Sequence, residues 1–170
     1  PPPLRSLSDK DLTPVASFIE GAVAHYEHLP HKQTMAYLHQ GFNYGDYGAV
    51  NHRIPTYREY RNQNLLALIC GARGTIQFNR MVAHYPELRI GMPYLTAELA
   101  SLASVFTAPD ASLKPEVDSD VARLLLKEHQ GQLWLFVCNA DMTAREVSFM
   151  VPGMGRHERV AVVSEARRIP

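Results

Sequence analysis

The sequence lacks a long apolar segment and an excess of either charge. No apolar run approaches the ~20 residues that a membrane-spanning helix requires. Lys+Arg and Asp+Glu both number 17, so the formal net charge is zero. This balance removes the electrostatic basis for binding nucleic acid or an anionic membrane, and we expect neither as a partner.

Cysteine is also scarce, since only Cys70 and Cys138 occur. Both lie in apolar surroundings, which is typical of small core residues; a disulfide between them is the alternative. The chain begins Pro1-Pro2-Pro3 without a starting Met, and we expect it to be part of a longer protein. Its 170 residues are 46% hydrophobic and 20% charged, which is enough for one domain core or one domain with a small appendage.

The clearest local signals lie between Ile54 and Met81. Thr56 and Glu59 have the spacing of a capping box, so we predict a helix that begins there. Gly71 supplies a left-handed residue to end this helix, and Thr75–Phe78 is a short extended run. A helix that leads into a short strand is half of a βαβ unit.

The flanking segments extend this pattern. Apolar residues between Val15 and Tyr26 recur at helical spacing, and Gln33–Gln40 reads as a strand buried on both faces. Beyond the central stretch, Pro93 is predicted to open a helix that reaches Phe106. From residue 121 onward the period is two, and we expect an antiparallel meander of four strands. These strands are predicted at 122–127, 133–139, 146–151 and 159–163.

The order helix, strand, helix, strand, helix predicts an α/β fold of barrel type. A complete eight-stranded barrel needs about 250 residues, so we expect only its last βα units here, followed by a small antiparallel β domain. The predicted division is residues 1–108 for the C-terminal portion of a (β/α)8 barrel, 109–120 for a linker, and 121–170 for a β-sandwich-like domain.

Several motifs resemble one family. The run from Tyr57 to Phe78 resembles the helix–strand closing segment of bacterial glycoside-hydrolase barrels, with a P-T-x-x-E-x-R-like helix start followed by A-L-x-x-G-A-x-G. Lys32–Gln40 is similar to their seventh strand, and Pro1–Leu4 to the Pro-rich loop after the sixth. The segment Leu133–Asn139 is similar to the start of their C-terminal β-sandwich. The resemblance implies a carbohydrate-active enzyme that hydrolyses glycosidic bonds, for which a secreted or periplasmic location is suitable.

The chain departs from this family at the catalytic carboxylates. Such enzymes use two carboxylates, one as acid and one as base or nucleophile. The proton donor would lie on an earlier strand, and the position where the seventh strand would carry the nucleophile reads His39-Gln40. Asp46 is the only carboxylate in the loop that follows; it is a weak catalytic candidate, because an Asp flanked by glycines is commonly a turn former.

The loops after the strands are therefore expected to bind a carbohydrate ligand, because the strand ends form the active face of a barrel. The rest of the parent barrel is the other expected partner, and no cofactor is predicted. The alternative is structural: Tyr44 and Tyr47 pack the loop, and Arg80 pairs with Asp46 or Glu87. The predicted substrate-binding residues are His39, Gln40, Asn43, Tyr44, Asn79 and Arg80.

Two further classes of function compete with this one. The first is a non-catalytic carbohydrate-binding or structural module, which agrees with the missing carboxylate. The second is a different barrel hydrolase that uses His39, His52 and His84. His25, His28 and His31 form a repeated H-x-x-H pattern, but Pro30 interrupts the helix and no further ligand completes a set, so we predict no metal site.

Overall fold

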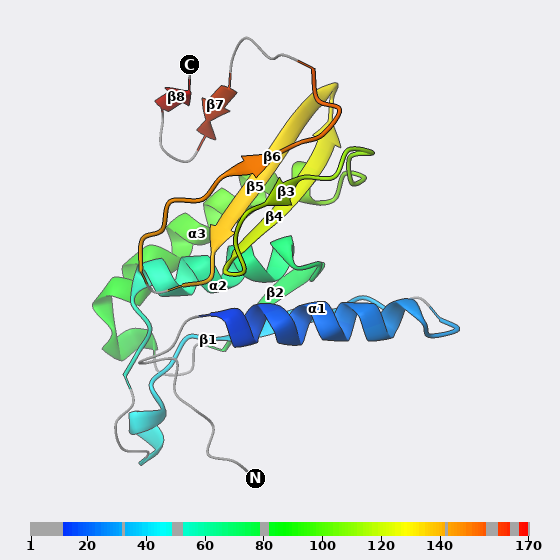
Figure 1. Cartoon of the computed structure of the whole chain (residues 1–170). Helices are drawn as coiled ribbons and strands as arrows, with labels where there is room; N and C mark the ends of the chain where they lie inside the picture. The colour runs from blue at the N-terminus through cyan, green and yellow to red at the C-terminus, as the bar shows by residue number, and fades with distance from the viewer. Residues whose placement is uncertain are drawn as a thin grey trace.

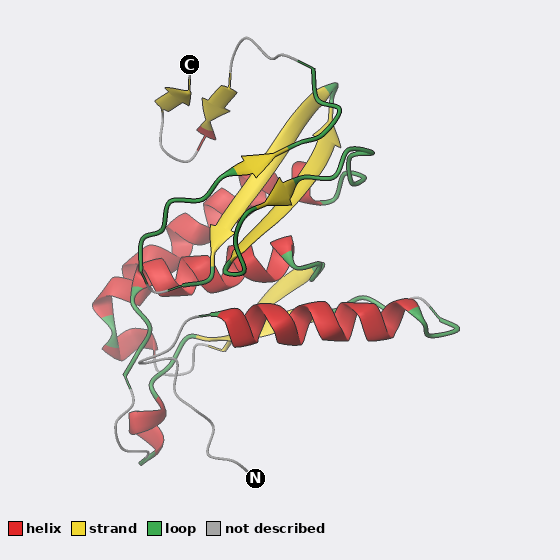
Figure 2. Ribbon diagram, viewed as in Figure 1, coloured by secondary structure: helices red, strands yellow, loops and turns green. Residues whose placement is uncertain are grey.

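The computed structural model describes residues 12–31, 33–48, 53–78, 82–141, 143–155, 160–163 and 167–169. Helices and strands are mixed along the chain (Figures 1 and 2). The helices are α1 (Thr13–Glu27), α2 (Tyr57–Ile69) and α3 (Pro86–Phe106), with short 3-10 helices η2 (Tyr44–Tyr47) and η3 (Val82–His84). The strands are β1 (Ala36–Gln40), β2 (Gly74–Phe78), β3 (Glu116–Val117), β4 (Ala122–His129), β5 (Gln132–Asn139), β6 (Phe149–Met150), β7 (Val160–Val162) and β8 (Arg167–Ile169).

The expected βαβ unit is present. Strands β1 and β2 pair in parallel, in a register that runs from Ala36 beside Gly74 to Gln40 beside Phe78, and α2 connects them. The predicted capping box begins α2, since the Thr56 and Glu59 side chains each accept from the other residue's backbone N–H. Gly71 has a φ of 105°, which is the left-handed conformation predicted for the helix end.

Helix α2 lies between two β layers. It contacts β1 and β2 on one side and the β4–β5 hairpin on the other (Figure 1). One hydrophobic cluster joins Leu12 and Ala16 at the start of α1 to Leu66 of α2 and Cys138 of β5. A second cluster joins Tyr60 of α2 to the α3 side chains Leu88, Met92 and Leu95. The hairpin therefore shares a core with the helices, while the predicted domain boundaries themselves stay a prediction.

The predicted hairpin between β4 and β5 is confirmed, with Gln130 and Gly131 both at positive φ in the turn. Its inner face carries Phe136, whose ring stacks on Phe106 of α3 at 4.3 Å. Lys127 of β4 is 2% exposed. Its Nζ lies 2.6 Å from Asp110 Oδ1 and donates to the Ala108 carbonyl at 2.9 Å. This pair fixes the segment after α3 onto the hairpin.

The predicted start of the third helix is wrong. Helix α3 begins at Pro86, and Pro93 lies inside it. Proline removes one helical hydrogen bond and normally disfavours this position. Here Leu88 on its N-terminal side and Leu95 on its C-terminal side are both buried against Tyr60, so packing along the whole helix outweighs the local cost.

The predicted meander is also wrong, because among the described residues β5 pairs with β4 alone and β6 pairs with β3. After β5, Asn139 Nδ2 donates to the Thr143 carbonyl and Arg145 pairs with Asp141. These contacts make a loop where a tight turn was expected, and the chain returns to β3. The strands predicted at 146–151 and 159–163 are shorter in the structure, where they correspond to β6 and β7.

The expectation that β1 is buried on both faces fails as well. His39 faces the helices and is 1% exposed, whereas Leu38 on the other face is 53% exposed. On the same face of β2, Ile76 beside Leu38 and Phe78 beside Gln40 are 54% and 41% exposed. Within the described parts of the chain, no helix combines the length and apolarity needed to cross a bilayer.

Candidate functional site

The parallel pairing of β1 and β2 brings the two strands to an end at the same edge. The Gly41 N–H donates to the Phe78 carbonyl at 3.0 Å and extends the pairing by one residue. A Cβ on Gly41 would lie 2.8 Å from that carbonyl oxygen and 3.3 Å from the Tyr60 ring. Glycine is therefore required for the chain to leave β1 so close to the end of β2.

The segment after β1 folds back on itself through its own amides. Gln40 Nε2 donates to the Phe42 carbonyl at 2.7 Å. Asn43 Oδ1 accepts from the Gly45 N–H at 2.8 Å and caps η2, which ends at Gly48 with a φ of 86°. Gln40 and Asn43, both predicted to bind substrate, thus also hold the loop in shape.

Aromatic rings gather at the same edge. Phe42 forms edge-to-face contacts with Tyr44 at 4.7 Å, Tyr47 at 5.7 Å and Phe78 at 4.9 Å between ring centroids. Such contacts fix the relative orientation of the rings. Tyr47 nevertheless keeps 51% of its surface exposed, so this cluster presents an aromatic ring to solvent.

A carboxylate connects this loop to the next one. The Tyr85 hydroxyl lies 2.7 Å from both oxygens of Asp46, and the Asn43 side chain also hydrogen-bonds that hydroxyl. Partial burial and then the hydrogen bond to Asp46 raise the pKa of Tyr85 above its ordinary value. Tyr85 immediately precedes α3. The contact therefore joins the loop after β1 to the loop after β2.

The starts of the two following helices are joined as well. Glu87 Oε1, in the first turn of α3, accepts from the Tyr57 N–H of α2 at 2.8 Å. The Arg53 guanidinium lies 2.5 Å from Glu59, and this hydrogen bond is the largest influence lowering the pKa of Glu59 below its ordinary value. Together with Asp46 and Tyr85, these contacts make one connected rim at the strand ends.

His39 does not belong to this rim. Neighbouring strand residues point to opposite faces, so His39 lies under α2 while Gln40 does not. Its ring makes an edge contact with Tyr60 at 4.6 Å, and within the described structure neither ring nitrogen has a hydrogen-bond partner. Burial lowers the pKa of His39 to about 4. The neutral imidazole is thus shielded from any ligand at the strand ends.

Other predicted positions are more scattered. Asn79, Arg80 and His52 lie outside the described residues. His84 is exposed in η3. In the described ranges no group of three or more His, Cys, Asp or Glu residues could hold a metal ion. Cys70 and Cys138 are free thiols.

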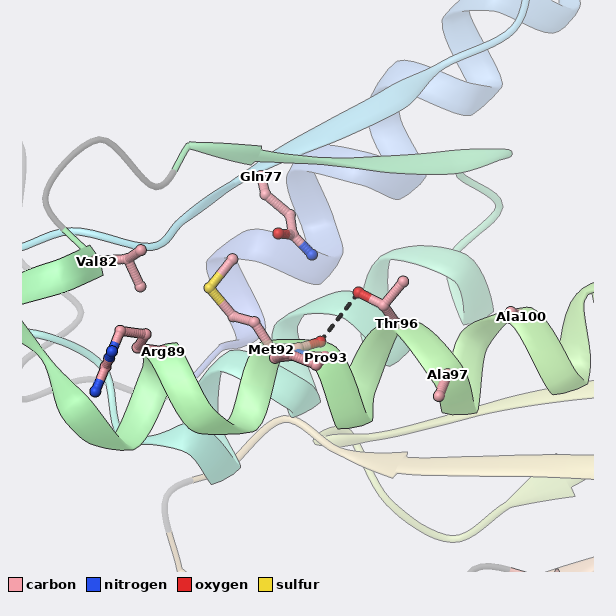
Figure 3. Close-up of a pocket in the computed structure, with 8 residues that line it drawn as sticks. All are labelled: Gln77, Val82, Arg89, Met92, Pro93, Thr96, Ala97 and Ala100. Atoms are coloured by element: carbon pink, nitrogen blue, oxygen red, sulfur yellow. Dashed lines mark hydrogen bonds between the residues drawn. The ribbon is translucent and has the colours of Figure 1, made fainter.

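A groove of about 570 Å³ runs beside the rim, between β2 and α3 (Figure 3). Figure 3 shows Gln77 of β2 pointing toward Met92 of α3, with Arg89 at one end. Among the described residues no carboxylate lines this groove, so they supply no acid–base pair to it. The lining residues are Gln77, Val82, Arg89, Met92, Pro93, Thr96, Ala97 and Ala100.

Nothing in the sequence indicated a role for Tyr85, and Tyr47 was considered only in the structural alternative, as a residue that packs the loop. The signal that could have found Tyr85 is the parallel pairing itself, since it brings the loops after consecutive parallel strands to one edge.

Comparison of the chain with protein-family models, curated proteins and solved structures finds no match. Any functional assignment therefore rests on the site.

Proposed function

We propose that this chain forms the closing βα units of a (β/α)8-barrel glycoside hydrolase and supplies loops that contact the carbohydrate. The observation that carries the proposal is the edge where β1 and β2 end. Asp46 and Tyr85 of the rim lie there together with Gln40, Asn43 and an aromatic cluster. Sugars present hydroxyl groups and an apolar ring face, and amides, carboxylates and aromatic rings bind both.

The sheet supports the barrel part of the proposal. A parallel sheet is normally covered on both faces, yet Leu38, Ile76 and Phe78 expose their side chains on one face of the β1–β2 pair. In a closed barrel these side chains would point into the barrel core and β2 would pair with a further strand. The groove between β2 and α3 lies along the side of β2 that faces the helices.

The proposal assigns the acid–base pair to other parts of the barrel. Both oxygens of Asp46 accept from the Tyr85 hydroxyl, which suits a carboxylate that holds the loop better than one that transfers a proton. The role of Asp46 in this proposal is thus to orient the loop and to accept from a sugar hydroxyl. His39 has no part in it, because its ring is buried under α2.

A non-catalytic carbohydrate-binding module is the second candidate. It is favoured by Gln40 at the end of β1, where the resemblance leads us to expect a carboxylate. The two candidates share the binding loops and differ in whether bonds are broken. A hydrolase using histidines is less favoured, since His39 is buried and its pKa is lowered.

The test is a paired measurement. A glycan array and calorimetric titration of this chain detect binding, and the complete protein is assayed for release of reducing ends from the glycans that bind. We expect binding by the chain and hydrolysis only by the complete protein. Binding without hydrolysis by the complete protein would favour the non-catalytic module, and absence of binding in both would refute the proposal.

A further inference from the structure

Tyr47 is the exposed member of the aromatic cluster. Its ring packs at 88° to that of Phe42, with 5.7 Å between centroids, and Phe42 is itself held by Phe78 of β2. A large aromatic ring that is 51% exposed but supported by another ring loses little freedom when a ligand covers it. Such preorganised rings contribute binding energy at low entropic cost.

A hydrogen-bonding carboxylate belongs to the residue that precedes this ring in the chain. Asp46 is adjacent to Tyr47 in η2, and its two oxygens share one hydroxyl donor, from Tyr85. A carboxylate offers about four acceptor positions, so Asp46 can accept further bonds from ligand hydroxyls. The ring therefore provides an apolar surface, and the carboxylate of the neighbouring residue in η2 provides acceptors.

We propose that Tyr47 is the stacking surface of a sugar subsite, with Asp46 accepting from a hydroxyl of the bound pyranose and Tyr85 positioning the loop. This inference rests on the proposed function and names contact residues for it. The apolar face of a pyranose covers the exposed face of Tyr47, and the equatorial hydroxyls at the sugar rim reach Asp46. Tyr85 acts through Asp46 and does not itself contact the sugar.

The stacking role is tested by calorimetric titration of the chain with maltotriose, cellotriose and the two methyl glucosides. For the sugar that the wild type binds, we expect Tyr47→Leu to weaken binding about tenfold, because an aliphatic side chain can pack on Phe42 but cannot stack on a sugar. Tyr47→Phe should stay within about threefold of the wild type. Tyr94→Leu is the matched control, since Tyr94 is 70% exposed on α3 and takes no part in the rim.

The positioning role is tested by Tyr85→Phe, which removes the hydroxyl and keeps the ring. We expect faster amide hydrogen exchange at Asp46 and Gly48, whose N–H groups donate within the loop at 3.0 and 3.1 Å, with the melting temperature almost unchanged. Sugar binding should weaken about threefold. Unchanged exchange and affinity in this variant would overturn the positioning role.

The proposed function and the subsite at Tyr47 are overturned by different outcomes. Wild-type affinity in Tyr47→Leu, with the variant folded by circular dichroism, overturns the subsite and leaves the proposed function in place. Failure of every sugar to bind either the wild-type chain or the complete protein, on the array and by titration, overturns the proposed function and the subsite together. Weakening by Tyr94→Leu equal to that by Tyr47→Leu overturns the assignment to Tyr47.

Discussion

The burial of His39 should make the protein less stable as the pH falls below neutral. The His39 side chain is 1% exposed, and neither ring nitrogen has a hydrogen-bond partner in the described structure. Burial disfavours the charged imidazolium and lowers the pKa from 6.5 to about 4. Below pH 6.5 the unfolded chain therefore binds a proton that the folded chain excludes, and the folded state loses stability as pH falls.

The magnitude follows from the interval between the two pKa values. From 6.5 down to about 4, at about 1.4 kcal/mol per pH unit, His39 removes about 3 kcal/mol of unfolding free energy. The loss is absent above pH 6.5 and nearly complete by pH 4. Since domains of this size are stable by only about 5–15 kcal/mol, this effect is measurable.

The perturbation is His39→Leu, which keeps an apolar side chain beside Tyr60 and removes the titrating group. We expect the variant to be at least as stable as the wild type at pH 7.5, because two unpaired buried nitrogens are removed. Between pH 7.5 and 4.5 it should lose about 2.5 kcal/mol less stability than the wild type.

The assay is urea denaturation followed by circular dichroism across this pH range. His31→Leu is the control, because His31 is exposed after α1; it should retain the wild-type pH dependence. Equal loss of stability in the wild type and His39→Leu would refute the reasoning, since it would mean that His39 is accessible to protons in the folded state.

Two further pairs of variants test packing. Gly91→Ala in α3 should destabilise the protein, because the new Cβ would lie 2.2 Å from the Tyr57 ring. The Cβ of Gly21→Ala in α1 meets nothing within 4 Å, so this variant should be about 1 kcal/mol more stable than the wild type in urea denaturation. The opposite order of stability would contradict the packing of α2 on α3. Asp110→Asn should lower the free energy of unfolding by about 1–3 kcal/mol, because it leaves the ammonium of Lys127 buried without its counter-ion. Lys127→Met should lower it by less, since the Asp110 side chain is 54% exposed and water can solvate it. Equal losses in thermal denaturation would show that Lys127 is not buried as described.

The sequence alone was sufficient for features that depend on neighbours along the chain. The Thr56–Glu59 capping box and the left-handed Gly71 follow from residues three or four positions apart, and both are confirmed. The β4–β5 hairpin is equally local, because two strands joined by Gln130 and Gly131 need no other element to set their register. A mixed helix and strand fold was predictable for the same reason.

Features that depend on distant contacts were missed. Local propensity placed the start of α3 at Pro93, whereas packing on Tyr60 carries the helix through that proline. The return of β6 to β3 was hidden because it brings residues 116–117 beside 149–150.

The candidate site divides in the same way. The sequence marked the loop after β1 as polar and aromatic, and hence as a candidate binding segment. It could not show that Asp46 meets Tyr85, 39 positions later, or that His39 is turned beneath α2 while Gln40 is not. A pattern along the chain reports which residues can form an element. Only the packing of β1, β2 and α2 decides which face of a strand is buried and which loops meet at its end.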